Sequence, residues 1–416
     1  MMKKLLMMIC LAAALAACGS DDDEAFAPQS VERTVVVYMS GENSLTSYVN
    51  GDLNEMKEGS RLIGPGSALL VYVDKSSKKE LPWLARIRDG QVTDSVSLSD
   101  MGINDADALS SDPHVFEDVL QYAVRHYPAT RDYGLVLWGH SSGWLVKDSV
   151  PYTRAYGVDN GRNDVSSNDG KWLNLPTMAR VLQKLPHFKF IFADCCNFMC
   201  LESLYELRNV ADYIIGSPAE IPAEGAPYSK MLPAMFQQDD NFYTAIVDRY
   251  YEQKVKGLDL PLSVVRTSEI EHVAQATRTA LAVINDSFNG SYADMTGLIY
   301  YYYDSSHKIY DPMYNIFYDA GDFMLRYAPE TVYRQWKEAL DRAVVYRRMS
   351  TCWNTDKGWN TYYGNHFTVT EERYHGVSMF VPQSPFSGYY SFYNRNIRQF
   401  AWYYAVNDLA GDNIIE

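Results

Sequence analysis

Short apolar runs alternate with amphipathic stretches along the first half of the chain. Continuous apolar and β-branched runs predict buried strands at 34–39, 68–74, 133–138, 188–192 and 213–217. Helical spacing of apolar residues predicts helices at 45–57, 113–127 and 198–210, with Asp112 as the N-cap of the second. An Asp89-Gly90 turn predicts a hairpin over 83–98. This alternation predicts an α/β fold with a mostly parallel sheet flanked by helices.

The pattern changes near Pro233, after which helical periodicity dominates. Helices are predicted at 242–255, 268–284 and 331–347. Strand-like pieces at 262–266 and 377–381 interrupt them, and we expect these to return to the main sheet. The prediction is a main α/β domain over 33–235 and a mainly helical C-terminal subdomain over 236–416.

The N-terminus has the pattern of a targeting segment. Lys3 and Lys4 precede an apolar stretch, 5–17, that is too short to span a bilayer. The stretch ends in Leu-Ala-Ala-Cys, which resembles a bacterial lipobox. We therefore predict a lipoprotein signal peptide over 1–17, a lipid on Cys18 and a flexible acidic tether over 18–32. The acidic run resembles a surface-export signal or is a plain solvated linker, and the predicted location is the outer membrane or cell surface.

Composition and charge narrow the function classes. Of the 416 residues 47% are apolar, which excludes a disordered chain. The chain carries 37 Lys and Arg against 52 Asp and Glu, a net charge of −15. A nucleic-acid-binding role is not expected of such a chain, whereas attraction of cationic substrates is.

Candidate catalytic residues follow the predicted strand ends, where ligands bind in open α/β sheets. His140 ends one strand, and Cys195 and Cys196 end the next. A Cys between a strand end and a helix N-terminus is expected to have a lowered pKa, and a nearby imidazole can transfer its proton. Gly139 to Gly143 also fits the G-x-S-x-G elbow of serine esterases, with Ser141 as nucleophile, although no helix is predicted directly after it.

Two segments resemble the signature blocks of the clostripain family of cysteine peptidases, in the caspase–gingipain–legumain clan. They are Leu-Val-Leu-Trp-Gly-His-Ser-Ser-Gly-Trp (135–144) and Phe-Ala-Asp-Cys-Cys-Asn-Phe-Met (192–199). Weaker similarity runs from about residue 33 to 385. The resemblance implies a caspase-like sheet and an endopeptidase that cleaves after Arg or Lys through a thioester acyl-enzyme.

The resemblance also implies the catalytic residues. His140 matches the dyad histidine, and the D-x-C pattern makes Cys196 the nucleophile, with Cys195 as its rival. The backbone N–H groups of Cys196 and Ser141 match the oxyanion hole. Ser141 stands where the family usually has Gly, which is why a non-catalytic surface binding protein on the same scaffold is a further alternative. Cys200 is expected to pack in the core.

A pocket for a basic side chain requires carboxylates. Asp194 matches the acidic position two residues before the nucleophile, its alternative role being a cap of the following helix. Glu220 and Glu224 are both candidates for a second pocket acid. The resemblance implies protein or peptide substrates with basic residues, and we expect a monomer that contacts the membrane only through its lipid.

The segment between the two blocks, 146–173, is polar and predicted to be a loop. Self-cleavage is expected at its basic residues, which are Lys147, Arg154, Arg162 and Lys171. Oxygen-bearing residues there could also gather calcium, namely Asp159, Asn160, Asn163, Asp164 and Asp169. No cofactor is expected to be required, and no metal-ligand motif is present in the sequence.

Overall fold

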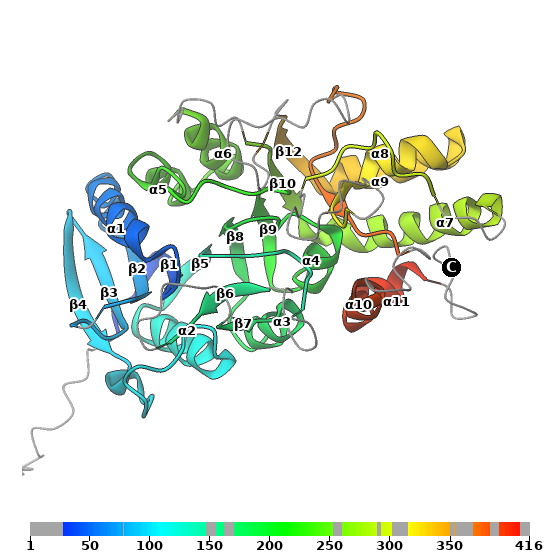
Figure 1. The fold of residues 1–416 in the computed structure, drawn as a ribbon. Helices are drawn as coiled ribbons and strands as arrows, with labels where there is room; N and C mark the ends of the chain where they lie inside the picture. The colour runs from blue at the N-terminus through cyan, green and yellow to red at the C-terminus, as the bar shows by residue number, and fades with distance from the viewer. Residues whose placement is uncertain are drawn as a thin grey trace, which may run out of the picture.

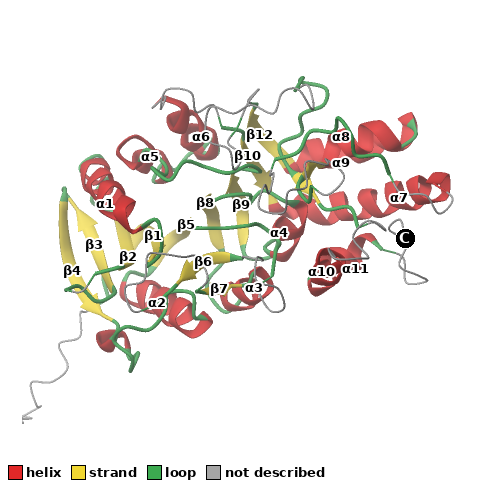
Figure 2. Cartoon of the chain, in the orientation of Figure 1, coloured by secondary structure: helices red, strands yellow, loops and turns green. Residues whose placement is uncertain are grey.

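A nine-stranded mixed sheet forms the centre of the molecule in the computed structural model (Figures 1 and 2). The structure describes residues 28–77, 79–146, 155–161, 170–252, 260–288, 293–301, 315–349, 353, 369–382 and 391–407. The strand order is β12-β10-β9-β8-β5-β1-β2-β3-β4. The strands are β1 (Val31–Gly41), β2 (Ser67–Lys75), β3 (Trp83–Arg88), β4 (Gln91–Ser97), β5 (Ala129–Trp138), β8 (Phe188–Asp194), β9 (Ala211–Gly216), β10 (Leu262–Arg266) and β12 (Val344–Arg348).

The five central strands, β9, β8, β5, β1 and β2, pair in parallel, and the pairs at both edges are antiparallel. The central strands are apolar on both faces because helices cover both. In β1, for example, residues 35–39 are all fully buried or nearly so. The hairpin β3–β4 turns at Asp89 and Gly90, which both have positive φ. The predicted α/β fold with a mainly parallel sheet is confirmed.

Helices pack on the two faces of this sheet (Figure 1). One face carries α1 (Thr46–Ser60), α5 (Tyr228–Met235) and α6 (Phe242–Glu252). The other carries α2 (Pro113–His126), α3 (Leu175–Leu182) and α4 (Leu201–Glu206). Asp112 caps α2 as predicted, because its carboxylate accepts a hydrogen bond from the backbone of His114. The predicted helix over 198–210 is much shorter in the structure, where α4 begins only at Leu201 and ends at Glu206.

The C-terminal half adds helices and two strands of the main sheet. Its helices are α7 (Ile270–Phe288), α8 (Ala320–Tyr327), α9 (Glu330–Ala343), α10 (Ser391–Asn396) and α11 (Ala401–Val406). The chain also forms 3-10 turns at Ser99–Met101, Thr267–Glu269 and Ile397–Gln399. Strand β10 pairs antiparallel with β9, and β12 pairs with β10 at the sheet edge.

Two predictions for this half are wrong. The helix predicted to reach 347 ends at Ala343, because Val344–Arg348 forms the edge strand β12 on β10. The strand predicted at 377–381 does not join the main sheet. Only Ser378–Met379 is a strand, β13, and it pairs with β11 (Tyr318–Asp319) in a separate two-stranded sheet.

A small hairpin lies within the predicted loop over 146–173. Strands β6 (Tyr156–Asp159) and β7 (Lys171–Leu173) pair antiparallel, and Tyr156 and Trp172 bury their rings. The backbone N–H of Gly157 donates to the carbonyl of His140 at 2.8 Å, and that of Ser142 donates to Ala155 at 2.9 Å. The hairpin therefore fixes the backbone that follows β5.

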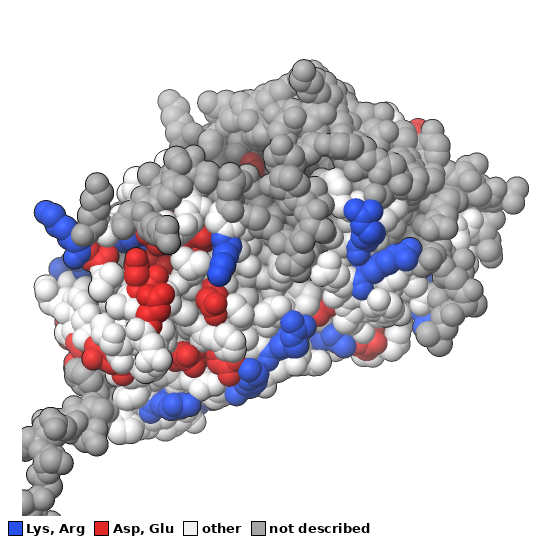
Figure 3. All heavy atoms as spheres, turned by 60° about the horizontal axis from the view of Figure 1, so that its bottom comes forward, with Lys and Arg blue, Asp and Glu red and all other residues white. Residues whose placement is uncertain are grey.

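The described surface carries charges of both signs, which lie near one another on the face in Figure 3. None of the helices in the described ranges combines the length and apolarity needed to cross a membrane. The predicted signal peptide and Cys18 lie outside the described residues, as do Lys147, Arg154 and Arg162.

Candidate active site

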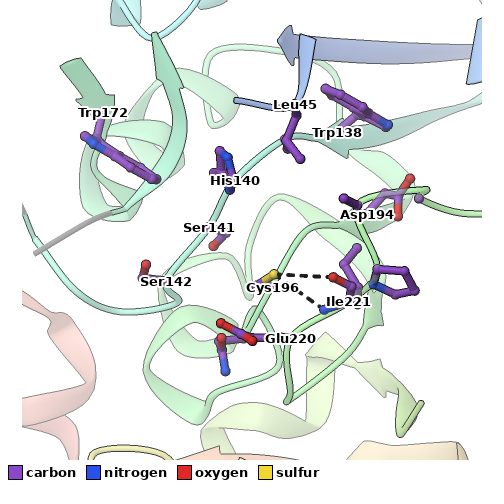
Figure 4. Close-up of a pocket in the computed structure, with 15 residues that line it drawn as sticks. Leu45, Trp138, His140, Ser141, Ser142, Trp172, Asp194, Cys196, Glu220 and Ile221 are labelled. Atoms are coloured by element: carbon purple, nitrogen blue, oxygen red, sulfur yellow. Dashed lines mark hydrogen bonds between the residues drawn. The ribbon is translucent and has the colours of Figure 1, made fainter. Parts of the chain in front are cut away.

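A cavity of about 240 Å³ opens at the carboxyl ends of the parallel strands (Figure 4). Four strand ends contribute to it: the loops that follow β1, β5, β8 and β9. Its lining includes Leu45, His140, Trp172, Asp194, Cys196 and Glu220. The structure thus brings together, in one cavity, the residues that the two signature blocks predicted.

The register of β5 and β8 sets the spacing of His140 and Cys196. Trp138 and Asp194 are paired residues on these parallel strands, and the N–H of Gly139 donates to the carbonyl of Asp194 at 3.4 Å. His140 and Cys196 each follow two residues later. Neighbouring strands lie about 4.8 Å apart, so equivalent positions just beyond their ends remain neighbours. Figure 4 shows both side chains in the cavity.

His140 is held from three directions. The hydroxyl of Ser44, in the loop after β1, lies 2.8 Å from Nε2. The ring centroid lies 6.4 Å from that of Trp172 on β7. Its carbonyl accepts the hydrogen bond from Gly157 on β6. The imidazole is therefore positioned by elements that are distant in sequence, and it stays partly exposed to the cavity.

The structure distinguishes the two adjacent cysteines. Cys196 lines the cavity and is half-buried, whereas Cys195 is fully buried in the core on the other side. The N–H of Ile221 donates to the Cys196 sulfur at 3.4 Å. Asn197 follows with φ of +54°, a left-handed conformation that Asn tolerates better than most residues. Only Cys196 is placed to react with a molecule in the cavity.

The predicted lowering of the cysteine pKa is wrong. Helix α4 begins at Leu201, so its N-terminus is not adjacent to Cys196, and Cys200 is the N-cap. Burial, and next the carboxylate of Glu220, raise the pKa of the Cys196 thiol to about 12. The resting group is therefore a thiol. Cys200 is fully buried in the core, in agreement with its expected packing role.

Ser141 does not have the geometry of an esterase nucleophile. The chain turns without forming a helix after it, and Ser141 instead forms a bridge with Tyr156 of β6. Its hydroxyl oxygen accepts a hydrogen bond from the N–H of Gly143 at 3.2 Å. A nucleophile elbow requires a strand, a strained turn and then a helix. This arrangement argues against the esterase alternative.

Asp194 is buried at the floor of the cavity. Its Oδ2 accepts hydrogen bonds from the Tyr228 hydroxyl at 2.6 Å and from the N–H of Ala226 at 3.1 Å. Its Oδ1 is buried without a hydrogen-bond partner. Burial raises the pKa of Asp194 to about 6. Asp194 does not cap α4, since Cys200 occupies that position.

The two candidates for a second pocket acid lie in different places. Glu220 lines the cavity near Cys196, whereas Glu224 is exposed and outside the lining. Two further residues could not be placed from the signature blocks: Trp172 on β7, which lines the cavity, and Asp52 on α1, which contacts the lining residue Trp138. Asp52 could have been noticed as a lone acid on the apolar face of its helix, between Val49 and Leu53.

A separate acidic cluster lies where β1, β2 and β6 end. Of the residues considered for calcium, Asp159 is close to Glu42 and Asp74, with carboxylate oxygens within 4.8 Å of one another. Asp159 accepts hydrogen bonds from the N–H groups of Ser110 and Gly161. Asn163, Asp164 and Asp169 lie outside the described residues. A role for calcium stays a prediction.

Replacing Asp74 by asparagine is expected to stabilise the fold at neutral pH. Burial and the neighbouring Asp159 raise the pKa of Asp74. Because the carboxyl pKa is higher in the folded state, the free energy of unfolding is largest at low pH, where the group is protonated. It decreases as pH rises towards the pKa of the folded state. An amide cannot ionise, so we expect a gain of about 1 kcal/mol, or a melting temperature higher by about 1 °C for a chain of this length.

Thermal melts of the wild type and Asp74→Asn at neutral and acidic pH, with a chelator present, measure the difference in melting temperature. This difference should become smaller as pH falls. Equal melting temperatures at neutral pH would contradict the prediction. A bound cation would favour two ionised carboxylates and reverse the sign. The same melts with added calcium therefore test the calcium prediction.

Comparisons with known proteins identify the family of the chain. The model of the Clostripain family matches residues 37–409. The chain is similar to a secreted C11 cysteine protease from Bacteroides thetaiotaomicron in complex with an irreversible peptide inhibitor, with 29% identity, 90% of this chain and 98% of that chain covered, and a TM-score of 0.70. An inactive zymogen C11 protease from Parabacteroides distasonis is 28% identical, with 92% and 99% covered and a TM-score of 0.71.

A further secreted C11 cysteine protease from Bacteroides thetaiotaomicron, "iotapain", shares the fold at 19% identity, with 91% of this chain and all 100% of that chain covered and a TM-score of 0.70. No curated protein matches the chain. Since the family model spans most of the sequence and the solved relatives share its fold, the chain belongs to the Clostripain family and is a cysteine peptidase.

Proposed function

We propose that the protein is an endopeptidase that cleaves peptide bonds after Arg or Lys, with Cys196 as nucleophile and His140 as acid–base partner. One observation carries the proposal. His140 and Cys196 follow paired positions of adjacent parallel strands and line one cavity, whose floor holds a buried carboxylate with an unpaired oxygen. The family membership supplies the class of reaction, and the geometry supports the roles of these residues.

The raised thiol pKa requires proton transfer during the reaction. His140 accepts the thiol proton as the Cys196 sulfur attacks the carbonyl carbon of the substrate. The imidazolium gives this proton to the amide nitrogen as the C–N bond breaks, which leaves a thioester. Water then attacks the thioester with His140 as base, and the second product leaves as a carboxylic acid while the thiol is restored.

Negative charge on the substrate oxygen develops near two backbone N–H groups, those of Cys196 and Ser141, which we propose as the oxyanion hole. The side chain at 141 is compatible with this role. Its hydroxyl accepts the hydrogen bond from Gly143, which holds the oxygen towards its own loop. Ser141 also has no positive φ, so the position does not demand glycine.

Asp194 is the proposed partner of the basic side chain before the scissile bond. A buried carboxylate requires an opposite charge or hydrogen-bond donors. In Asp194 the Tyr228 hydroxyl and the Ala226 N–H both donate to Oδ2, and no group donates to Oδ1. An incoming guanidinium or ammonium group supplies the missing donors. Glu220 lies on the other side of Cys196 from Asp194 in Figure 4, and it is the proposed second acid of the pocket for the basic side chain.

The location of the enzyme is part of the proposal. The lipobox-like sequence before Cys18 supports a lipid anchor, and the residues from 18 to 32 then tether the peptidase to the outer membrane or cell surface. Two of the relatives are described as secreted proteases. Metabolic labelling with a fatty acid in cells, with a Cys18→Ala control, tests the anchor independently of activity.

The activity is tested with an irreversible peptidyl-Arg chloromethyl ketone and an Arg-ending fluorogenic peptide. We expect the fluorogenic peptide to be cleaved, and the probe to block cleavage and to modify Cys196, as mapped by mass spectrometry. A peptide with Asp in place of Arg serves as control and should not be cleaved. Binding of the Arg peptide without turnover under reducing conditions would favour the non-catalytic alternative instead.

A further inference from the structure

A second acid, Asp52, lies behind the floor of the cavity. It projects from the buried face of α1, where it is only 4% exposed. Its Oδ2 accepts a hydrogen bond of 2.5 Å from the indole N–H of Trp138, the last residue of β5. Trp138 lines the cavity and is paired with Asp194 in the sheet. Asp52 is therefore connected to the cavity floor although its position in the sequence is far from both signature blocks.

The two carboxylates converge at Gly225. The position that a Cβ on Gly225 would take lies 2.7 Å from Oδ2 of Asp52, 3.2 Å from Oδ2 of Asp194 and 3.4 Å from the Trp138 indole nitrogen. Gly225 lines the cavity with φ of +69°. A Cβ that close to Oδ2 of Asp52 would force one of the two to move, so this approach of the loop to both acids requires glycine. Glycine thus lets the loop that lines the cavity lie directly against both carboxylates.

No basic group of the described chain neutralises this pair. Within the described ranges, the hydrogen bonds to Asp52 and Asp194 come from an indole, a phenol and a backbone amide, and neither carboxylate forms an ion pair with Lys, Arg or His. Oδ1 of Asp194 remains unpaired although it is buried. Two buried carboxylates without a cation are unfavourable. The arrangement is consistent with a cation that arrives with the substrate.

The proton affinities of the two acids differ in the empty site. Burial, and next the charge of Asp194, raise the pKa of Asp52 to about 8, whereas that of Asp194 rises to about 6. The other acids near Asp52 are Glu55 and Glu224, which act in the same direction, and the Tyr228 and Tyr250 hydroxyls are also close. At neutral pH the empty site therefore holds a proton mainly on Asp52.

We propose that Asp52 is a further carboxylate of the subsite for the basic side chain, in addition to Asp194 and Glu220, and that together with Asp194 it selects arginine over lysine. This inference rests on the proposed function. A guanidinium is planar and has five N–H donors, so it can address two carboxylates at once, whereas an ammonium acts as a single point charge. Entry of the cation favours the ionised form of Asp52, which gives up its proton to solvent.

The first test compares Asp52→Asn with the wild-type enzyme on two fluorogenic peptides that differ only in Arg or Lys before the scissile bond. Asparagine keeps an oxygen for the Trp138 hydrogen bond and removes the charge. We expect KM for the Arg peptide to rise about 10-fold or more, the scale of a lost hydrogen bond to a charged group. We expect kcat to change little and the Arg-to-Lys ratio of kcat/KM to fall.

Glu58→Gln is the matched control, because Glu58 lies on the same helix and is exposed. It removes the same charge and should leave both constants unchanged. An unchanged Arg-to-Lys ratio in Asp52→Asn would overturn the role of Asp52. If the wild-type enzyme cleaves neither peptide, the proposed function itself is wrong. The two failures are thus distinguishable.

A second measurement keeps Asp52 in place and does not depend on the stability of the variant. Benzamidine, an aromatic amidinium, is titrated into the Cys196→Ala protein by calorimetry at neutral pH in two buffers with different ionisation enthalpies. Binding should release a proton, and it should strengthen as pH rises towards 8, because the ionised carboxylates bind the cation. Binding without proton release, or no binding, would overturn the proposal.

Discussion

Replacing Cys196 by alanine is expected to lower kcat on an Arg-ending peptide by about 10⁴-fold or more, the scale of loss when a catalytic nucleophile is removed. Cys196 is the cysteine that faces the cavity next to His140, while Cys195 points into the core. Steady-state hydrolysis with equal concentrations of folded protein measures the effect. In the proposed mechanism the sulfur forms the acyl bond, so no neighbouring group can substitute for it.

Cys195→Ala is the matched control, since it removes the adjacent thiol and leaves the cavity lining unchanged. It should retain most of the activity, with a modest loss of stability from the small space left in the core. Turnover that survives in Cys196→Ala and disappears in Cys195→Ala would move the nucleophile by one residue. Turnover that survives in both would contradict a cysteine mechanism in this cavity.

Replacing Asp194 by asparagine is expected to lower kcat/KM for basic substrates by about 10²–10³-fold, because removing one member of a buried charge pair costs roughly 3–5 kcal/mol. Asparagine keeps an oxygen for Tyr228 and Ala226, so the loop after β9 stays anchored. Hydrolysis of the Arg peptide gives the kinetic effect. Glu224→Gln, which removes an exposed acid from the same loop, should have little effect.

The same variant should be more stable than the wild type. Burial raises the pKa of Asp194 to about 6, so the folded state loses stability as pH rises from about 4 through that value. Removing the charge should recover up to about 3 kcal/mol at neutral pH, the equivalent of about two pKa units. A purely structural Asp194 would show the opposite result, a less stable protein, and full activity on Arg peptides would refute its pocket role.

Strands could be predicted from the sequence most clearly where both faces of the sheet are buried. Strands β1, β2 and β5 are apolar on both faces because helices cover the sheet on both sides, and such runs are visible without any partner. The end of α9 was not visible. No Gly or Pro separates Val344–Arg348 from the preceding helix. The segment is a strand because it pairs with β10, and this contact cannot be read from the local sequence.

The site shows the same division. His140 and Cys196 could be predicted because each ends a strand, and the register of the sheet then brings them together. Asp52 stands out in the sequence only as a lone acid on the apolar face of its helix. Its contact with Trp138, 86 residues away, could not be predicted, because it depends on how α1 packs on the sheet. The thiol pKa was mispredicted because the length of α4 decides whether a helix terminus reaches the sulfur.

The pairing of β5 with β8 has a consequence for the integrity of the chain. His140 and Cys196 are held next to each other by the sheet's hydrogen bonds, and not by the 55 residues of backbone that connect them in sequence. A cut at Lys147 or Arg154 falls outside β5, β6 and β8. Two fragments that remain paired in the sheet would therefore keep the proposed catalytic pair together, so a two-chain form of the protein is compatible with the proposed activity.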